Sequence, residues 1–304
     1  MSKFVTAKCL EKKYLSFLSS QEVKSEPFYN KLGQFKNFYL PICEKIYKDY
    51  KKNNKIKIIG LTGGQGAGKS TITQIVRLIL NYKYNLKVTY FSIDDFYKTL
   101  KQRTNFANKI SKLFKIRGVP GTHDTGLLKK TFSNLMKKNF KPVLIPTFDK
   151  SRDDRAPKKK WKKINHQPNI IIFEGWCVGA NSQTNKDLKK PINILEKNED
   201  PKLTWRKRVN KELKNEYRKI FDRIDKLIFL KVPNFECVYK WSLLQEKKLH
   251  LTSKGKKIMS ASQIRKFIMY YQRITLQMLK DLTNKSDVVL YLDNKHRLNK
   301  IRFN

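Results

Sequence analysis

A glycine-rich stretch in the first quarter of the chain has the residues of a nucleotide-phosphate site. Residues 60–71 read GLTGGQGAGKST and follow the apolar stretch KIKII, so they fit the pattern G-x-x-x-x-G-K-[ST] between a strand and a helix. Glycines allow successive backbone N–H groups to face one anion, the lysine reaches the β- and γ-phosphates, and the serine hydroxyl ligates Mg²⁺. We expect the triphosphate site to comprise Gly63, Gly64, Gln65, Gly66, Ala67, Gly68, Lys69, Ser70 and Thr71.

Two adjacent aspartates follow the next apolar stretch, in SIDDFY at 92–97. In an open parallel sheet, ligands gather at the carboxyl ends of the strands. Phosphoryl transfer to an alcohol needs a carboxylate that orients the hydroxyl and takes its proton, and acidic groups around Mg²⁺. Asp94 and Asp95 are candidates to divide these tasks. The alternative is a capped turn at a strand end, a position that aspartate favours.

An acidic residue also ends a later apolar run, NIIIFEG at 169–175. The carboxylate that follows such a strand downstream of a phosphate loop usually contributes to Mg²⁺ binding. Glu174 is therefore the second candidate metal ligand beside Ser70, with Asp95 as a third. Trp176 is either a wall of the pocket or an ordinary core aromatic.

Two charge-dense stretches lie between these segments, RGVPGTHD at 117–124 and FDKSRDDRAPKKKW at 148–161. Arginine suits an anionic acceptor because its planar fork binds both oxygens of a carboxylate. Taken singly, each charged residue is also explained as a solvated loop residue, and a lone histidine as a structural hydrogen-bonding residue. The candidate donors are Arg117, His123, Lys150, Arg152 and Arg155.

Short apolar runs alternate with amphipathic stretches from Lys55 onwards, which is typical of a parallel α/β sheet. We expect strands at 55–61, 87–93, 143–148, 169–175, 226–232 and 287–293, and helices at 69–81, 126–138, 203–217, 235–249 and 260–282. The polar stretches 101–124, 149–167 and 180–202 have no clear period, and we interpret them as long loops, which are often functional.

The net charge of the chain is +42, from 67 Lys and Arg against 25 Asp and Glu. Such a charge suggests a nucleic-acid or anionic-surface binder, but scattered lysines without aromatic stacking platforms favour compositional bias. We therefore expect no specific nucleic-acid partner. The four cysteines form no CxxC pair, and no apolar run approaches the roughly 18 residues of a membrane helix. These features favour a cytoplasmic protein that does not contact the membrane.

The motifs together resemble those of the D-glycerate 3-kinases, which belong to the phosphoribulokinase/uridine kinase group of P-loop kinases. GLTGGQGAGKST, SIDDFY, RGVPGTHD, PTFDKSRDDRAPKKKW and IIFEGWCVG occur in the order seen in that family, followed by VYKWSLLQE and MSASQIRKFIMYYQR. The resemblance spans about residues 55–293. It implies a P-loop NTPase fold of the α/β class, with a doubly wound parallel sheet and flanking helices. We expect residues 1–54 to form an N-terminal helical extension and 55–304 the kinase domain.

The resemblance also implies an activity: transfer of the ATP γ-phosphoryl group to D-glycerate, a small hydroxy acid, giving 3-phosphoglycerate, with Mg²⁺ as cofactor. Asp94 matches the catalytic base of the wider group, and Lys69 and Glu174 complete the expected catalytic set. The expected substrate-binding residues are Asp95, Tyr97, Arg117, His123, Asp124, Asp149, Lys150 and Arg155.

The chain departs from the family pattern at Ser242, where the family usually has arginine after the tryptophan of its VYxWR segment. The DKS loop also looks shorter and less glycine-rich than in the plant-type enzymes. These departures leave another hydroxylated metabolite open as the acceptor. The net charge of +42 leaves a second alternative, a nucleic-acid-associated P-loop ATPase.

Overall fold

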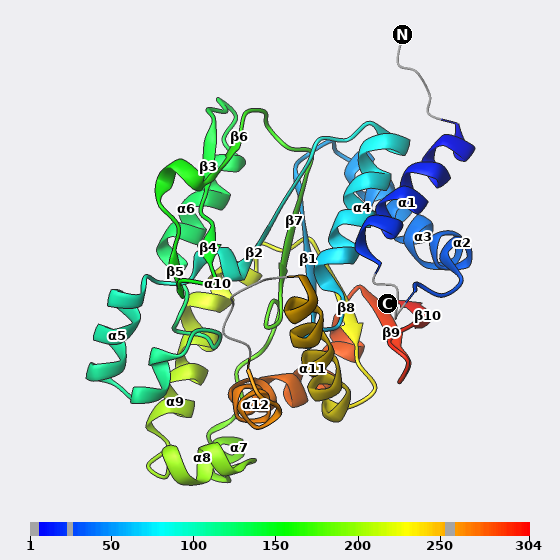
Figure 1. Ribbon diagram of the computed structural model, residues 1–304. Coiled ribbons are helices and arrows are strands. Elements are labelled where there is room, and N and C mark those ends of the chain that lie inside the picture. Colours follow the sequence, from blue (N-terminus) through cyan, green and yellow to red (C-terminus); the bar gives the residue numbers. More distant parts are fainter. Residues whose placement is uncertain (1–5, 23–26, 253–258) are drawn as a thin grey trace.

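Six strands form the central sheet, in the order β10-β9-β8-β1-β7-β2 (Figure 1). The computed structural model describes residues 6–22, 27–252 and 259–304. Five strands are mutually parallel, and β10 pairs antiparallel with β9. The apolar pattern did not predict β10, because most of its residues are at least partly exposed. The strands are β1 (Lys57–Gly63), β2 (Val88–Ser92), β7 (Ile170–Gly175), β8 (Lys226–Lys231), β9 (Val288–Leu292) and β10 (Leu298–Phe303).

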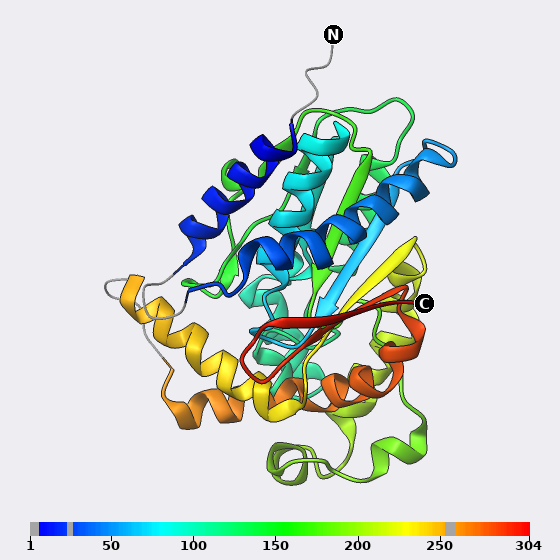
Figure 2. The same cartoon turned by 90° about the vertical axis from the view of Figure 1, so that its right-hand side faces the viewer.

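Helices cover both faces of the sheet (Figure 2). Because successive strand residues point to opposite faces, a central strand must be apolar on both. Ile59 and Leu61 of β1 join one apolar cluster, with α4 (Lys69–Tyr84), whereas Ile58 joins the other, with α6 (Thr125–Leu135) and α12 (Ala261–Lys285). This is a doubly wound α/β P-loop fold, and the prediction of the fold class is confirmed.

The predicted strand at 143–148 does not belong to this sheet. Its first half, β3 (Val143–Ile145), pairs antiparallel with β6 (Lys162–Ile164) in a separate two-stranded ribbon. Leu144 is 44% exposed between two buried neighbours, the pattern of a strand with one solvent face rather than of a parallel strand buried on both. A second ribbon follows, in which β4 (Phe148–Asp149) pairs with β5 (Asp154–Arg155).

Two of the stretches interpreted as long loops, 101–124 and 180–202, contain α-helices, and the third, 149–167, contains β5 and β6 of the ribbons, so that interpretation was wrong. α5 (Leu100–Lys109) begins at a capping box of Thr99 and Gln102, but its buried residues are Arg103 and Ala107, which leave no apolar period to read. The other helices in these stretches are α7 (Asn185–Lys189) and α8 (Ile194–Glu199). Beyond them, where the sequence predicts helices at 203–217 and 235–249, lie α9 (Thr204–Glu212), a π-helical turn (Leu213–Tyr217), α10 (Arg218–Phe221) and α11 (Phe235–Thr252).

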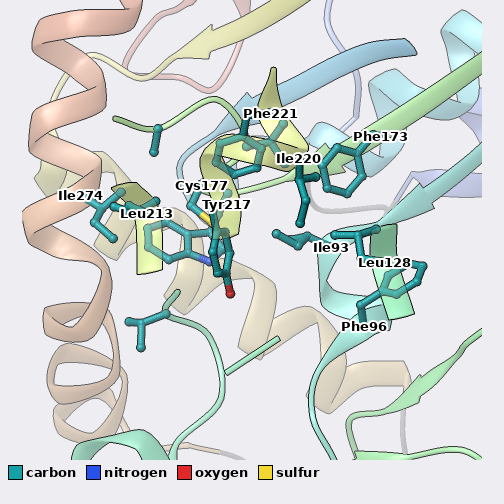
Figure 3. Close-up of a cluster of buried hydrophobic side chains, with 14 of the residues drawn as sticks. Ile93, Phe96, Leu128, Phe173, Cys177, Leu213, Tyr217, Ile220, Phe221 and Ile274 are labelled. Atoms are coloured by element: carbon teal, nitrogen blue, oxygen red, sulfur yellow. The ribbon is translucent and has the colours of Figure 1, made fainter. Parts of the chain in front are cut away.

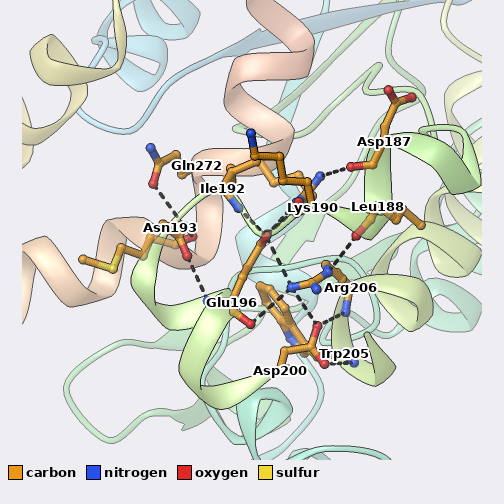
Figure 4. Close-up of polar contacts among 12 residues, drawn as sticks. Asp187, Leu188, Lys190, Ile192, Asn193, Glu196, Asp200, Trp205, Arg206 and Gln272 are labelled. Carbon is orange, nitrogen blue, oxygen red and sulfur yellow. Dashed lines mark hydrogen bonds and ion pairs between the residues drawn. The ribbon is translucent and has the colours of Figure 1, made fainter. Parts of the chain in front are cut away.

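A buried ionic network ties α7, α8 and α9 to α12 (Figure 4). The Arg206 guanidinium donates to the Leu188 carbonyl and lies 3.5 Å from a Glu196 carboxylate oxygen. Arg273 of α12 donates to the same carboxylate at 2.6 Å. The network holds the helices around α12 and includes none of the expected site residues.

The N-terminal residues are helical, as predicted: α1 (Ala7–Gln21), α2 (Lys31–Gln34), a π-helical turn (Phe35–Tyr39) and α3 (Leu40–Lys51). Residues 1–5 and 23–26 of the predicted extension lie outside the described residues. α1 and α3 pack against α4, and their apolar residues share one cluster with a face of the sheet. Within residues 6–22, 27–252 and 259–304, no helix is long and apolar enough to cross a membrane.

Candidate functional site

The phosphate loop joins β1 to α4, as the sequence predicts. Gly68 has a φ of 89° immediately before α4. Gly66 has a φ of 74°, and a Cβ atom at this position would lie 2.9 Å from Cβ of Trp241 in α11. Both the left-handed conformation and the close approach of α11 therefore require glycine at position 66.

The Lys69 side chain is hydrogen-bonded to the backbone of the phosphate loop. Its Nζ donates to the carbonyl oxygens of Gly63 at 3.0 Å and Gly64 at 2.8 Å. Burial lowers the pKa of Lys69, and the negative charges of Glu174 and Asp94 oppose that shift. The ammonium group therefore lies at the phosphate loop with two carboxylates close enough to influence it.

Glu174 meets Ser70 because β7 pairs in parallel with β1, with Leu61 opposite Glu174. The Ser70 hydroxyl donates to Glu174 Oε1 at 2.8 Å, and Oε2 is buried with no partner among the described residues. Burial raises the pKa of Glu174, while the Lys69 charge and the Ser70 hydrogen bond oppose this.

These two oxygen-bearing side chains fit Mg²⁺, a hard cation that is usually held by one or two carboxylates together with phosphate oxygens and water. The described residues contain no group of three or more His, Cys, Asp or Glu that could hold a metal ion without such help. The Ser70 hydroxyl and the Glu174 carboxylate therefore suit a Mg²⁺ ion whose other ligands are phosphate oxygens and water.

Asp94 and Asp95 lie in a 3₁₀ turn (Ile93–Phe96) at the carboxyl end of β2, but they have different contacts. The Asp95 carboxylate accepts the Ser92 amide at 3.0 Å, the capped turn considered above as the alternative. Asp94 accepts the Tyr97 hydroxyl at 2.8 Å, and Lys150 Nζ lies 3.5 Å from its other oxygen. The Asp94 side chain is 29% exposed, so its carboxylate is accessible at the sheet edge.

The electrostatic surroundings of the two aspartates also differ. Burial acts to raise the pKa of Asp94. The charge of Lys150, together with smaller contributions that include the Tyr97 hydrogen bond and the Lys69 charge, outweighs burial, so the pKa lies below its ordinary value. Burial raises the pKa of Asp95 to about 6, and the neighbouring charges of Asp94 and Glu174 add to this shift. The pair thus consists of one carboxylate held ionised and one held closer to neutrality.

The RGVPGTHD loop reaches the same edge through His123, whose ring stacks on Tyr97 with centroids 4.4 Å apart. Asp124 has a structural contact, because its Oδ1 accepts the Leu127 amide and caps α6. Its Oδ2 accepts from Arg155 at 3.0 Å, and Arg155 also donates to the Tyr97 carbonyl at 2.8 Å. The structure therefore brings His123, Asp124 and Arg155 together around Tyr97, whose hydroxyl donates to Asp94.

Two predicted substrate residues are engaged within the protein. The Arg117 guanidinium pairs with Asp153, a residue that sequence reasoning did not single out. Asp149 Oδ1 accepts the amides of Ser151 at 3.0 Å and Arg152 at 3.3 Å, so it shapes the turn that carries Lys150.

Sequence reasoning also missed Arg103 of α5, whose side chain is fully buried. Its guanidinium donates to the carbonyl oxygens of Lys98, Lys115 and Asp153 and pairs with the Asp153 carboxylate. It therefore ties together the segments that follow SIDDFY, precede RGVPGTHD and follow DKS. An arginine in a stretch without apolar period reads as a solvated residue, so no local signal identified it.

Two aromatic residues support the site from the core. Trp176 is 4% exposed and its Nε1–H donates to the Gly118 carbonyl at 2.9 Å, so it is a core aromatic that also anchors the RGVPGTHD loop. Trp241, which covers Gly66, stacks on the His296 ring with centroids 4.2 Å apart. Ser242, the departure from the family pattern, has a buried hydroxyl without a partner in the described part of the chain.

Known proteins resemble this chain over most of its length. The model of the Phosphoribulokinase / Uridine kinase family matches residues 58–236. The uncharacterized kinase mug58 of Schizosaccharomyces pombe is 34% identical over 256 residues, which cover 80% of this chain and 90% of that protein. The chloroplastic D-glycerate 3-kinase of Arabidopsis thaliana is 30% identical over 255 residues, which cover 77% of this chain and 52% of that protein.

A solved structure supports the fold. The D-glycerate 3-kinase from Cryptococcus neoformans superimposes with a TM-score of 0.73 at 20% identity, covering 87% of this chain and 97% of that one. The family match covers more than half of the chain, and it includes the phosphate loop, the SIDDFY turn and Glu174. The chain therefore belongs to the phosphoribulokinase/uridine kinase family of ATP-dependent P-loop kinases, which act on small molecules.

Proposed function

We propose that this kinase transfers the γ-phosphoryl group of ATP to a hydroxyl of D-glycerate, giving 3-phosphoglycerate and ADP. One observation carries the proposal. An accessible carboxylate, Asp94, lies at the sheet edge within the electrostatic reach of Lys69 and Glu174, and Lys150 of the DKS loop adjoins it. A kinase of an anionic alcohol needs this combination of a base and nearby positive charge.

On the donor side, the backbone of residues 63–70 and Lys69 would hold the triphosphate. Ser70 and Glu174 would hold Mg²⁺, and Asp95 would support the metal site from beside Glu174, whose charge adds to the burial that raises the Asp95 pKa. When bound, Mg²⁺ neutralises charge on the phosphate oxygens. Lys69 would exchange its two carbonyl partners for phosphate oxygens, which match its full charge better than neutral carbonyls do.

On the acceptor side, Asp94 would accept the proton of the attacking hydroxyl. A new bond then forms between the acceptor oxygen and the γ-phosphorus, the bond to the bridging oxygen breaks, and ADP leaves. Burial holds the pKa of Tyr97 well above its ordinary value, so its hydroxyl stays protonated and keeps donating to Asp94 Oδ1. This contact fixes the orientation of the carboxylate before the acceptor arrives.

The basic residues differ in their availability to the acceptor carboxylate. Lys150 is 64% exposed beside Asp94 and is our first candidate for that contact. Arg155 already binds Asp124, and Arg117 already pairs with Asp153. Both would therefore act on the acceptor through their charge rather than by direct contact. The choice of D-glycerate as the acceptor rests on the PGTHD and DKS…DDR motifs and on the similarity to the Arabidopsis enzyme.

The test is an ADP-release assay on the purified protein with ATP, Mg²⁺ and a panel of acceptors. The panel contains D-glycerate, L-glycerate, uridine, pantothenate and ribulose 5-phosphate, and phosphorus NMR identifies the product. We expect turnover on D-glycerate with 3-phosphoglycerate as the product. Turnover confined to another member of the panel would contradict the proposed acceptor while keeping the kinase chemistry.

A further inference from the structure

A line of four side chains runs from the site into the core. Tyr97 donates to Asp94 at 2.8 Å, its ring stacks on His123, and His123 Nδ1 lies 2.6 Å from the Tyr217 hydroxyl. Tyr217 belongs to the π-helical turn 213–217 and is fully buried. Figure 3 shows it among Cys177, Leu213 and Ile220. A π-helical turn inside a helix is unusual and frequently marks a functional position.

The hydrogen bonds of the Tyr217 hydroxyl fix the direction of its proton. Its oxygen accepts the Gly121 amide at 3.0 Å. Burial holds the pKa of Tyr217 well above its ordinary value, so the hydroxyl keeps its own proton. Among the described residues, His123 Nδ1 is the atom placed to accept a hydrogen bond from that hydroxyl. Tyr217 therefore donates, and Nδ1 accepts.

This direction determines the protonation of His123. The residue is 1% exposed, and burial lowers its pKa to about 3, so the ring is neutral and carries one N–H at pH 7. Because Nδ1 accepts from Tyr217, the proton lies on Nε2. Nε2 has no partner among the described residues. No described donor to Nε2 therefore favours the other neutral form, in which Nδ1 carries the proton.

We propose that Tyr217 is a positioning residue of the kinase site, which holds His123 as the neutral Nε2–H tautomer beneath Tyr97. The His123 ring then packs against the Tyr97 ring and keeps the Tyr97 hydroxyl within hydrogen-bond distance of Asp94. It does so without adding a third positive charge to those of Lys150 and Lys69, which already act on Asp94. An imidazolium at this place would lower the pKa of Asp94 further and make its carboxylate a weaker base. The kinetic part of this inference rests on the proposed role of Asp94 as the base.

The direct test is nitrogen NMR of the full-length protein labelled with ¹⁵N-histidine, at pH 7. The chain has four histidines, and the signal lost in His123→Gln identifies His123. We expect the wild-type signal of a neutral ring protonated at Nε2, and in Tyr217→Phe a change toward a mixture of tautomers. A ring protonated at Nδ1, or a charged ring, in the wild type would overturn the inference.

The kinetic test compares Tyr217→Phe with Tyr14→Phe. Tyr14 is a matched control, because it is 1% exposed and its hydroxyl donates to the Lys31 carbonyl at 2.9 Å, in the N-terminal helices. We expect kcat to fall roughly ten- to a hundredfold in Tyr217→Phe, as for a misplaced reacting group, with the KM for ATP nearly unchanged. Tyr14→Phe should keep the wild-type kcat. Equal kcat in Tyr217→Phe and wild type would overturn the positioning role.

The two proposals can fail separately. If the wild type does not phosphorylate D-glycerate, the proposed acceptor is wrong, and the comparison is repeated with the acceptor that the panel identifies. The NMR measurement needs no substrate at all, so the tautomer is decided in either case.

Discussion

Asp94 and Asp95 show how two identical neighbours acquire different tasks. The Asp95 carboxylate is committed to the Ser92 amide, and burial raises its pKa to about 6. Asp94 instead contacts a protonated tyrosine and a lysine, which stabilise the ionised form. A carboxylate that is ionised and accessible can accept a proton, whereas its buried neighbour serves better as a cap and as support for the proposed metal site.

Replacing Asp94 by asparagine tests this division. Asp94→Asn keeps the size of the side chain and an oxygen for Tyr97, but it cannot take a proton. We expect kcat to fall about 10²-fold or more, the scale of a lost general base, with ATP binding retained. Steady-state kinetics and nucleotide titration measure the two effects. Asp222→Asn, at a 53% exposed surface position, should behave as wild type. Unchanged turnover in Asp94→Asn would remove Asp94 from the role of base.

The buried neutral ring of His123 predicts a pH dependence of stability. Its pKa falls from 6.5 in the unfolded chain to about 3 in the folded protein. As the pH falls below 6.5, the unfolded chain binds the proton first, so the free energy of unfolding decreases by about 1.4 kcal/mol per pH unit until about pH 3. Between pH 7 and pH 5, wild type should therefore lose about 2 kcal/mol more than His123→Gln.

Urea midpoints of both proteins at the two pH values measure this difference. Asp95 acts in the opposite sense, because its raised pKa removes stability as the pH rises from about 4 toward 6, but it is present in both proteins. Identical pH dependence of wild type and variant would show that His123 titrates in the folded protein as it does in the unfolded chain.

At the scale of elements, the acceptor side is assembled from short pieces that Arg103 joins. The guanidinium presents donors in several fixed directions, which suit the three carbonyls of Lys98, Lys115 and Asp153. A lysine ammonium has the same charge but cannot reach three carbonyls in that plane. Arg103 therefore helps to fix the relative position of the segments that carry Tyr97, Arg117 and Lys150.

Arg103→Lys should raise the KM for the acceptor and lower kcat, together about tenfold in kcat/KM, with little change in the KM for ATP. Arg206→Lys is the matched control, because Arg206 is also buried and binds backbone carbonyls, but in the network of Figure 4. Both variants should lose thermal stability. An equal rise of the acceptor KM in both would attribute the effect to general loosening rather than to the three loops.

The sequence alone sufficed where the signal is local. The phosphate loop is contiguous, and the strand-end rule placed Asp94 and Glu174 at one edge before their contacts were known. It failed where a residue's partner comes from a distant turn. Nothing near Arg117 in the sequence indicates Asp153 as its partner, and nothing near His123 indicates Tyr217, 94 residues away. The ribbon at 143–145 also looked like a sheet strand, because three apolar residues do not reveal which faces are covered.

At the scale of the whole molecule, the chain has a large net positive charge, although the candidate site contains several carboxylates. The chain carries 67 Lys and Arg against 25 Asp and Glu, yet Asp94, Asp95 and Glu174 meet at one sheet edge. A net positive charge attracts anionic molecules such as ATP and the proposed acceptor over a distance of about 10 Å at 0.1 M salt. In the proposed mechanism the local carboxylates bind the metal ion and the proton, whereas the long-range field speeds the encounter with anionic molecules.

The N-terminal helices connect this overall architecture to the site, because they pack on the helix that begins at the phosphate loop. Ile42 and Cys43 of α3 are buried, and Cys43 Sγ contacts the Val76 carbonyl of α4 at 3.8 Å. The boundary at residue 54 remains a prediction. The shared apolar cluster indicates that the extension contributes to the stability of α4, and through α4 to the position of Lys69 and Ser70.

Deleting residues 1–54 should therefore do more than remove an appendage. It would expose the outer apolar face of α4 to water, and we expect poor solubility and loss of the thermal shift that ATP gives the full chain. Ile42→Ala is the milder variant, which should lower the free energy of unfolding by about 2–5 kcal/mol while the folded fraction still binds ATP. Thermal scans with and without ATP measure both. A truncated protein with the full-length melting temperature and ATP shift would instead establish residues 1–54 as an independent extension, because α4 would then need no cover from α1 and α3.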